Sequence, residues 1–158
     1  MGRFDDDTLP AERMVEFGGG RNRFSRAALW APVMVDAAAA AERIIEAYNA
    51  KAFEEMEALI APDLDFAHFN RNFVMSTREE LLGVLREFAS TYVPDRRFEA
   101  PERVTVAGPI CVREGWYGGT AAVDLPGFGA QGERFRFKFC SIMRFDEAGL
   151  LAEWKDHG

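Results

Sequence analysis

A carboxylate falls on the apolar side of the last strand that the sequence predicts. In LLAEWKDHG, apolar and polar residues alternate, and Asp156 is on the side that carries Ala152 and Trp154. This period of two is typical of a strand, because successive side chains point to opposite faces. A buried carboxylate is costly unless it is paired or used in chemistry. Asp156 is therefore a candidate proton carrier.

An imidazole falls on the apolar side of a second predicted strand, LDFAHFNRNF. There, His68 and Asn70 share a face with Phe66, and Tyr48 adds a hydroxyl from late in the first predicted helix. An imidazole and a carboxylate in an aromatic-lined cavity suit general acid–base catalysis. Low dielectric and mutual proximity are expected to move both pKa values toward neutrality. We therefore predict His68, Asp156 and Tyr48 as catalytic residues.

Each of these residues also has an ordinary structural explanation. A single inward histidine is commonly a hydrogen-bonded core residue, and Asp156 could tie down the chain end. Asn70 could close a strand end, and Tyr48 could be a core residue with its hydroxyl at the rim. The combination is more informative than any one residue.

The remaining predicted site residues come mainly from two aromatic strands. In FRFKFCSIMRF, phenylalanines alternate with arginine and lysine, and Ser141 lies on the aromatic side. For the strand over 110–124 two registers are open, one with Glu114 and Trp116 inward and one with Arg113 and Tyr117 inward. Nearby glycines would also permit a bulge. We favour the first register and predict these substrate-binding residues: Asn70, Glu114, Trp116, Phe137, Phe139, Ser141 and Trp154.

The elements that must position these groups are helices first and strands afterwards. Helices are predicted over 36–52, 53–61 and 76–92, the last opened by a capping box of Ser76 and Glu79. Strands are predicted over 64–73, 97–107, 110–124, 133–145 and 150–156, the last two joined by a tight hairpin at DEAG. This order indicates an α+β fold with helices on one face of a bent, mostly antiparallel sheet. Residues 1–35 are predicted to be an N-terminal arm that packs on the domain or on a neighbouring subunit, and 36–158 the domain itself.

Composition argues against several functional classes. The 158 residues carry a formal net charge of −7, which disfavours nucleic-acid and anionic-membrane surfaces. Two histidines are too few for a convincing metal cluster, and no nucleotide-binding motif is present, so we expect no metal or organic cofactor. The start of the chain lacks the apolar core of a signal peptide, and a cytoplasmic location is the default expectation.

Two long segments resemble the SnoaL-like, NTF2-like superfamily. AERIIEAYNAKAFEEMEALIAPDLDFAHF is similar to its opening helices and first strand, and FCSIMRFDEAGLLAEWKDHG to its closing hairpin. The resemblance covers roughly residues 36–158. It implies an NTF2-like cone, in which three N-terminal helices pack on a strongly curved sheet around a pocket.

The resemblance also bears on site residues. The general base of ketosteroid isomerases falls on His68, while the catalytic carboxylates of limonene-epoxide hydrolases and of polyketide cyclases fall on Asp156. The second carboxylate of the epoxide hydrolases is missing or displaced to Glu114, and a helix tyrosine of scytalone dehydratases falls on Tyr48.

The function that we predict from residues and resemblance together is a cofactor-independent acid/base enzyme of lyase, cyclase or isomerase type. It would carry out aldol or retro-aldol chemistry, or a dehydration, on a small hydrophobic substrate of aromatic or polyketide-like character. The alternatives are an epoxide hydrolase and a non-catalytic ligand-binding module. A homo-oligomer, either dimer or trimer, is the expected assembly.

Overall fold

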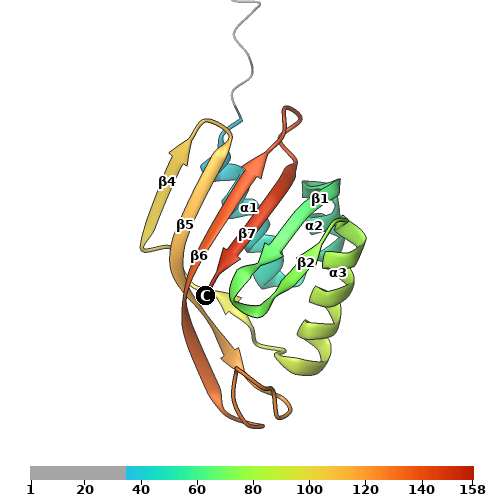
Figure 1. The fold of residues 1–158 in the computed structure, drawn as a ribbon, viewed down its shortest axis with the longest axis vertical. Coiled ribbons are helices and arrows are strands. Elements are labelled where there is room, and N and C mark those ends of the chain that lie inside the picture. Colours follow the sequence, from blue (N-terminus) through green and yellow to red (C-terminus); the bar gives the residue numbers. More distant parts are fainter. Residues whose placement is uncertain (1–34) are drawn as a thin grey trace, which may run out of the picture. The chain divides into compact units, whose positions relative to one another are not determined.

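A computed structural model of the chain describes residues 35–158, so the prediction of an N-terminal arm lies almost wholly outside the described residues. This part holds three α-helices and seven β-strands, and two of the strands lie between the second and third helices (Figure 1). The helices are α1 (Ala37–Ala50), α2 (Phe53–Leu59) and α3 (Arg78–Glu87), and a π-helical turn (Phe88–Tyr92) extends α3. The strands are β1 (Ile60–His68), β2 (Phe73–Met75), β3 (Arg97–Phe98), β4 (Arg103–Ala107), β5 (Ile110–Thr120), β6 (Arg134–Phe145) and β7 (Leu151–His157).

The helix ends follow local hydrogen-bonding chemistry. Asp36 begins α1 by accepting a hydrogen bond from the backbone N–H of Ala39 at 3.0 Å. The capping box of α3 is formed by Thr77 and Glu80, one residue later than the predicted pair of Ser76 and Glu79. The sequence permits both pairs, because Ser76 and Thr77 are adjacent and each is followed by a glutamate three residues later.

One parallel pairing sets the geometry of the sheet. The strand order is β2-β1-β7-β6-β5-β3, with β4 also pairing with β5. Every pair is antiparallel except β1 with β7, which run side by side in the same direction. Figure 1 shows the sheet curving, with the long strands β5 and β6 extending beyond the others. The mostly antiparallel, curved sheet that the sequence predicts is confirmed.

Several predicted boundaries differ from the structure, and the strand predicted over 110–124 ends at Thr120. The segment predicted to end the second helix starts β1 instead, at Ile60, because its backbone pairs with Leu151 of β7. β1 ends at His68, and Asn70 lies in a short 3₁₀ turn rather than in the strand. The single strand predicted over 97–107 is two strands, β3 and β4.

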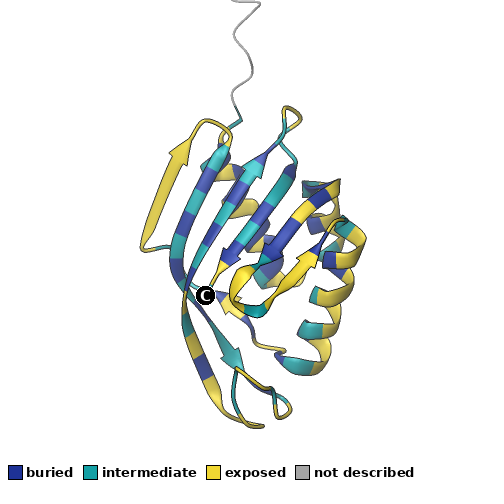
Figure 2. Ribbon diagram, in the orientation of Figure 1, coloured by how far each residue is buried: buried dark blue, intermediate teal, exposed yellow. Residues whose placement is uncertain are grey.

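The core lies between α1 and one face of the sheet. Ile44, Ile45 and Tyr48 of α1 pack in one cluster with Met143 of β6 and Trp154 of β7. Figure 2 shows buried and less buried residues alternating along β5, β6 and β7, as the period-two patterns predict. The aromatic side of β6 therefore faces the core.

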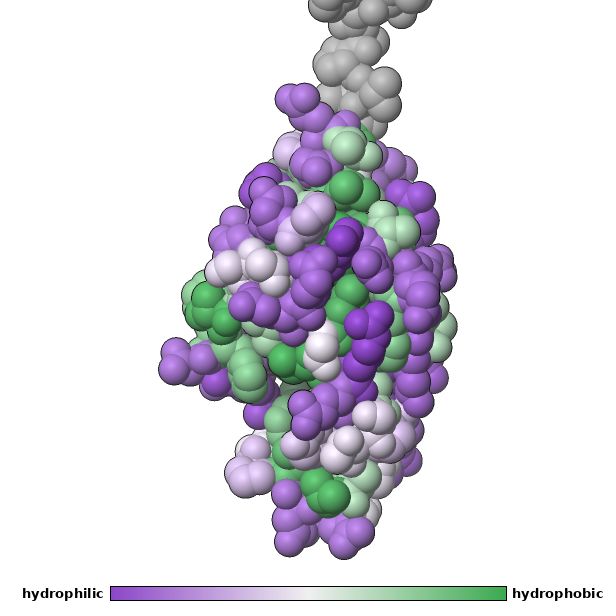
Figure 3. All heavy atoms as spheres, turned by 90° about the vertical axis from the view of Figure 1, so that its right-hand side faces the viewer, coloured by the Kyte–Doolittle hydropathy of each residue, from purple (hydrophilic) through white to green (hydrophobic). Residues whose placement is uncertain are grey.

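The surface that Figure 3 shows is largely hydrophilic, with apolar side chains in a broken seam between charged ones. Among residues 35–158, no helix has the length and apolar character needed to cross a membrane.

Candidate active site

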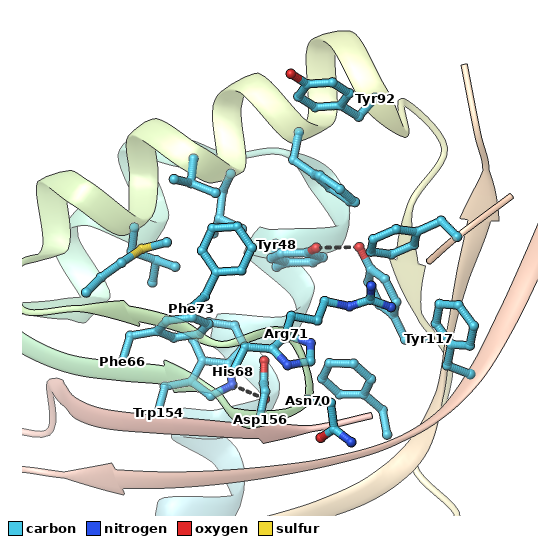
Figure 4. A pocket seen from close by; sticks show the side chains of 18 of the residues that line it. Tyr48, Phe66, His68, Asn70, Arg71, Phe73, Tyr92, Tyr117, Trp154 and Asp156 are labelled. Atoms are coloured by element: carbon cyan, nitrogen blue, oxygen red, sulfur yellow. Dashed lines mark hydrogen bonds between the residues drawn. The ribbon is translucent and has the colours of Figure 1, made fainter. Parts of the chain in front are cut away.

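A cavity of about 640 Å³ opens into the core beside α1 and α3 (Figure 4). Most of its wall is aromatic or aliphatic, and a few polar groups interrupt it. Seven predicted site residues line it: Tyr48, His68, Asn70, Phe137, Phe139, Trp154 and Asp156. The parallel β1–β7 pair brings several of them together, because its two strands set Phe66 beside Trp154 and His68 beside Asp156.

Asp156 is a buried carboxyl group with an asymmetric set of partners. Its Oδ1 accepts hydrogen bonds from Ser141 Oγ and from Trp154 Nε1, each at 2.6 Å. Its Oδ2 accepts no hydrogen bond from the described residues, and Figure 4 shows an oxygen of Asp156 directed into the cavity. Burial raises the pKa of Asp156 to about 7, although the two hydrogen bonds lower it. Near neutral pH this carboxyl group can therefore both take up and release a proton.

His68 is half-buried at the same end of the cavity. Its ring meets the ring of Phe139 edge-on with centroids 5.3 Å apart, and its Nδ1 is buried without a partner among the described residues. Burial lowers the pKa of His68 to about 4, and the positive charges of Arg71 and His157 add to this effect. His68 is therefore a neutral imidazole near pH 7. No hydrogen bond or ion pair links it to Asp156.

A pair of tyrosines forms a second polar position in the cavity wall. The hydroxyls of Tyr48 and Tyr117 are 2.9 Å apart and buried. Burial raises the pKa of Tyr48 to about 12 and that of Tyr117 well above its ordinary value, so both hydroxyls keep their protons. One hydroxyl donates to the other, which leaves one proton of the pair free for a ligand oxygen.

Glu114 and Trp116 do not line the cavity, so their prediction as substrate-binding residues is wrong. The pairing of β5 with β6 runs from Ile110 to Thr120 in continuous register, without the bulge considered from the sequence. The other side of β5 therefore faces inward, with Arg113 and Tyr117 buried. Glu114 instead forms an ion pair with Arg103, and Trp116 Nε1 donates to Glu102.

Two other predicted residues lie behind the cavity wall or at its edge. Ser141 is buried and does not line the cavity, but its hydroxyl holds Asp156. Asn70 lines the cavity, and its Oδ1 accepts a hydrogen bond from the backbone N–H of Gly158 at 3.0 Å. This contact agrees with the simpler explanation of Asn70, that it closes a strand end, because Gly158 directly follows β7.

The sequence-based prediction omits four polar or charged residues that line the cavity: Arg71, Glu87, Tyr92 and Tyr117. Tyr117 belongs to the alternative register of β5, and its pairing opposite Phe137 on β6, which the sequence does not encode locally, places it in the cavity wall. Strand alternation beyond His68 would direct Arg71 toward solvent, but the turn that follows β1 carries its side chain into the cavity. Nothing in the local sequence marks that change of direction.

The polar groups of the cavity can transfer a proton and stabilise an oxygen. Among residues 35–158, no three His, Cys, Asp or Glu side chains are grouped so that they could hold a metal ion.

Comparison with known families agrees with the topology described above. The profile of the SnoaL-like domain family matches residues 41–154, which is most of the described chain. The chain belongs to the SnoaL-like family. None of the curated proteins compared with it matches.

Solved structures with similar folds share little sequence with this SnoaL-like chain. A provisionally assigned polyketide cyclase from Xanthomonas campestris has a TM-score of 0.67 at 17% identity, covering 77% of this chain and 89% of the other. IdmH from Streptomyces antibioticus, another provisionally assigned polyketide cyclase, has a TM-score of 0.65 at 19% identity, covering 77% and 90%. An epoxide hydrolase from M. tuberculosis, related to the limonene-epoxide type, has a TM-score of 0.63 at 19% identity, covering 80% and 84%. These likenesses show the NTF2-like fold.

Proposed function

We propose that this chain is a cofactor-independent acid/base enzyme that acts on a small hydrophobic substrate of aromatic or polyketide-like character. The reaction class is aldol or retro-aldol chemistry, or a related dehydration. The observation that carries the proposal is Asp156, a buried carboxyl group in an aromatic cavity with a pKa of about 7. A general base or acid is most effective when its pKa lies near the working pH.

In the proposed reaction, Asp156 removes a proton from a carbon next to a substrate carbonyl. The electron pair of that C–H bond moves into the carbonyl, whose oxygen becomes an enolate oxygen. The Tyr48–Tyr117 pair, with one free hydroxyl proton, stabilises this oxygen. The enolate carbon then forms a bond to a second carbonyl carbon, and the protonated Asp156 returns its proton to the new alkoxide.

Ser141 and Trp154 position the base. Both donate to Oδ1, so they fix the carboxyl plane and leave Oδ2 for the substrate. His68, neutral near pH 7, supplies a hydrogen-bonding ring at the same end of the cavity rather than a second charge. The aromatic wall that includes Phe137 and Phe139 would receive the substrate body.

The geometry favours this reaction over the two alternatives. Epoxide hydrolysis of the limonene-epoxide type calls for a second carboxylate, and Glu114, the candidate from the sequence, lies outside the cavity. A binding module has no need of a buried carboxyl group whose pKa lies near 7. The similarity to provisionally assigned polyketide cyclases supports the same choice.

Proton exchange at an activated carbon tests the proposal without the natural substrate. In D₂O, the protein is mixed with 2-tetralone, an aryl ketone with acidic C–H bonds, and loss of the α-proton signals is followed by NMR. We expect exchange faster than buffer alone, and a loss of roughly 10²–10⁴-fold in Asp156→Asn, the usual effect of removing a positioned base. Lys155→Gln, on the opposite face of β7, serves as the control. Equal exchange by wild type and Asp156→Asn would contradict the proposal.

A further inference from the structure

A positively charged side chain enters the cavity without a carboxylate to neutralise it. Arg71 leaves the turn after β1 and lays its guanidinium over the ring of Phe128, with Cζ 3.7 Å from the ring centroid. The same group lies 5.3 Å from the centroid of Phe137. Within residues 35–158, Arg71 has no ion pair and no hydrogen bond to another side chain. Its charge is therefore available to a ligand.

A second guanidinium lies behind the tyrosine pair. Arg96 is only 1% exposed, and its Cζ is 4.1 Å from the centroid of the Tyr48 ring. None of its three side-chain nitrogens has a hydrogen-bond partner in the described part of the chain. A buried charge without a partner is costly. Arg96 does not line the cavity, so it adds positive potential behind the Tyr48 ring without contacting a ligand in the cavity.

The acidic groups of the cavity lie elsewhere. Asp156 lies at the His68 end, and Glu87 is an exposed residue of α3 that accepts a hydrogen bond from the Tyr92 hydroxyl. Neither forms an ion pair with Arg71 or Arg96. Figure 4 shows the Arg71 side chain reaching from its turn toward Tyr117. Burial lowers the pKa of Arg71, and the nearby Tyr117 opposes that change.

We infer that the substrate carries a carboxylate, which binds Arg71 at the Tyr48–Tyr117 end of the cavity. The inference rests on the proposed function and specifies its substrate class as an aromatic keto acid. A planar guanidinium matches a carboxylate in a bidentate arrangement, and the ring of Phe128 beneath it holds that plane in place. The ketone oxygen of the substrate would then reach the free proton of the tyrosine pair.

This anchoring also orients the substrate. A carboxylate at Arg71 places the rest of the molecule along the phenylalanine wall, with the reacting carbon directed toward Asp156. The reverse orientation would bring the carboxylate to the Asp156 carboxyl group, where like charges repel when both are ionised. Arg71 is thus a specificity residue that selects both charge and direction.

A pair of probes that differ in charge and little in shape tests this inference. Binding of 2-naphthoate and of 2-naphthamide is measured by isothermal titration calorimetry near pH 7.5. For the wild type we expect naphthoate to bind about tenfold or more tightly than the amide, because a charge-assisted pair is stronger than a neutral one. Arg71→Gln should remove that preference, and Arg71→Lys should keep part of it. Arg97→Gln, on the exposed side of β3, is the matched control and should behave as wild type.

Each contrary result has a defined meaning. Similar affinities for the two probes in the wild type, no binding of naphthoate, or a preference that survives in Arg71→Gln would overturn the inference. Circular dichroism and a thermal melt confirm that each variant is folded. The proposed function is tested separately, because 2-tetralone is neutral and its exchange depends on Asp156 and not on Arg71. A preference for naphthoate without 2-tetralone exchange would support the carboxylate site and contradict the proposed reaction. Exchange without a preference for naphthoate would support the proposed reaction and contradict the carboxylate site.

Discussion

His68 and Asp156 are partners across the parallel β1–β7 pair, and the cavity drives both toward their uncharged forms. The expectation that both pKa values approach neutrality is met by Asp156, at about 7, and is wrong for His68, at about 4. Burial penalises the charged form of each group and so raises the carboxyl pKa and lowers the imidazole pKa. The two residues therefore do not form an ion pair that exchanges a proton near pH 7. Of the two, only Asp156 titrates near neutrality.

Replacing Asp156 with Asn should stabilise the protein at alkaline pH. The pKa of Asp156 is raised in the folded state, so its stabilising contribution is present below about pH 4 and is lost as pH rises through about 7. Asn keeps the acceptor for Ser141 and Trp154 and carries no charge. At pH 8 the melting temperature of Asp156→Asn should exceed that of wild type. The corresponding gain in the free energy of unfolding is up to about 4 kcal/mol. At pH 5 the gain should be smaller. A gain that is equal at both pH values would show that the carboxyl group is not perturbed.

Replacing His68 with Gln should make the protein less sensitive to acid. The pKa of His68 is lowered in the folded state, so stability is lost as pH falls from about 6.5 through about 4. Gln cannot take up a proton at this position. The melting temperature of the variant relative to wild type should therefore rise as pH falls through that window, and it should stay constant above pH 7. Thermal melts across pH 4–8 measure it, with Lys155→Gln as the control because Lys155 does not contribute to the pKa shift of His68.

Removing the hydroxyl of Ser141 should shift the pH dependence of the reaction. The hydrogen bond from Ser141 lowers the pKa of Asp156, so Ser141→Ala should raise that pKa. If Asp156 is the base, the exchange rate rises with pH around a midpoint near 7, and the variant should move that midpoint upward by roughly half a unit to one unit. Cys140→Ala, the neighbour on the other face of β6, should leave it in place. An unchanged midpoint in Ser141→Ala would show that the pH dependence of the exchange rate does not report the titration of Asp156.

Removing the hydroxyl of Tyr117 should weaken stabilisation of the enolate oxygen. Tyr117→Phe keeps the ring and deletes half of the hydroxyl pair, so 2-tetralone exchange should fall by roughly 10–10²-fold with little change in circular dichroism. Trp116→Phe alters the adjacent residue on the outer face and should leave exchange within about twofold of wild type. A larger loss of exchange in Trp116→Phe than in Tyr117→Phe would contradict this prediction and would favour the register of β5 in which Trp116 faces inward.

The sequence was sufficient to predict elements whose two faces differ clearly. Phenylalanine alternates with arginine and lysine in β6, and the helix of alanines and isoleucines before it has one apolar side, so their orientation follows from periodicity. The inward position of Asp156 was predictable for the same reason, since Trp154 shares its face of β7.

Other features depended on contacts that the sequence does not encode locally. β5 carries a charged and an aromatic residue on each side, Arg113 and Tyr117 against Glu114 and Trp116, so only its pairing with β6 decides which side is buried. Arg71 enters the cavity because the chain turns directly after β1, with Asn72 in a left-handed conformation.

The position of β7 between β1 and β6 also constrains when the cavity can form during synthesis. A ribosome makes β1 early and β7 last among the described strands, yet β7 is an interior strand that joins the two parts of the sheet. His68 therefore emerges with an open strand edge beside it until Asp156 has been translated and threaded into place. The sheet cannot be completed before β7 is synthesised. A translation product that ends before β7 would therefore expose the unpaired edge of β1 to neighbouring chains.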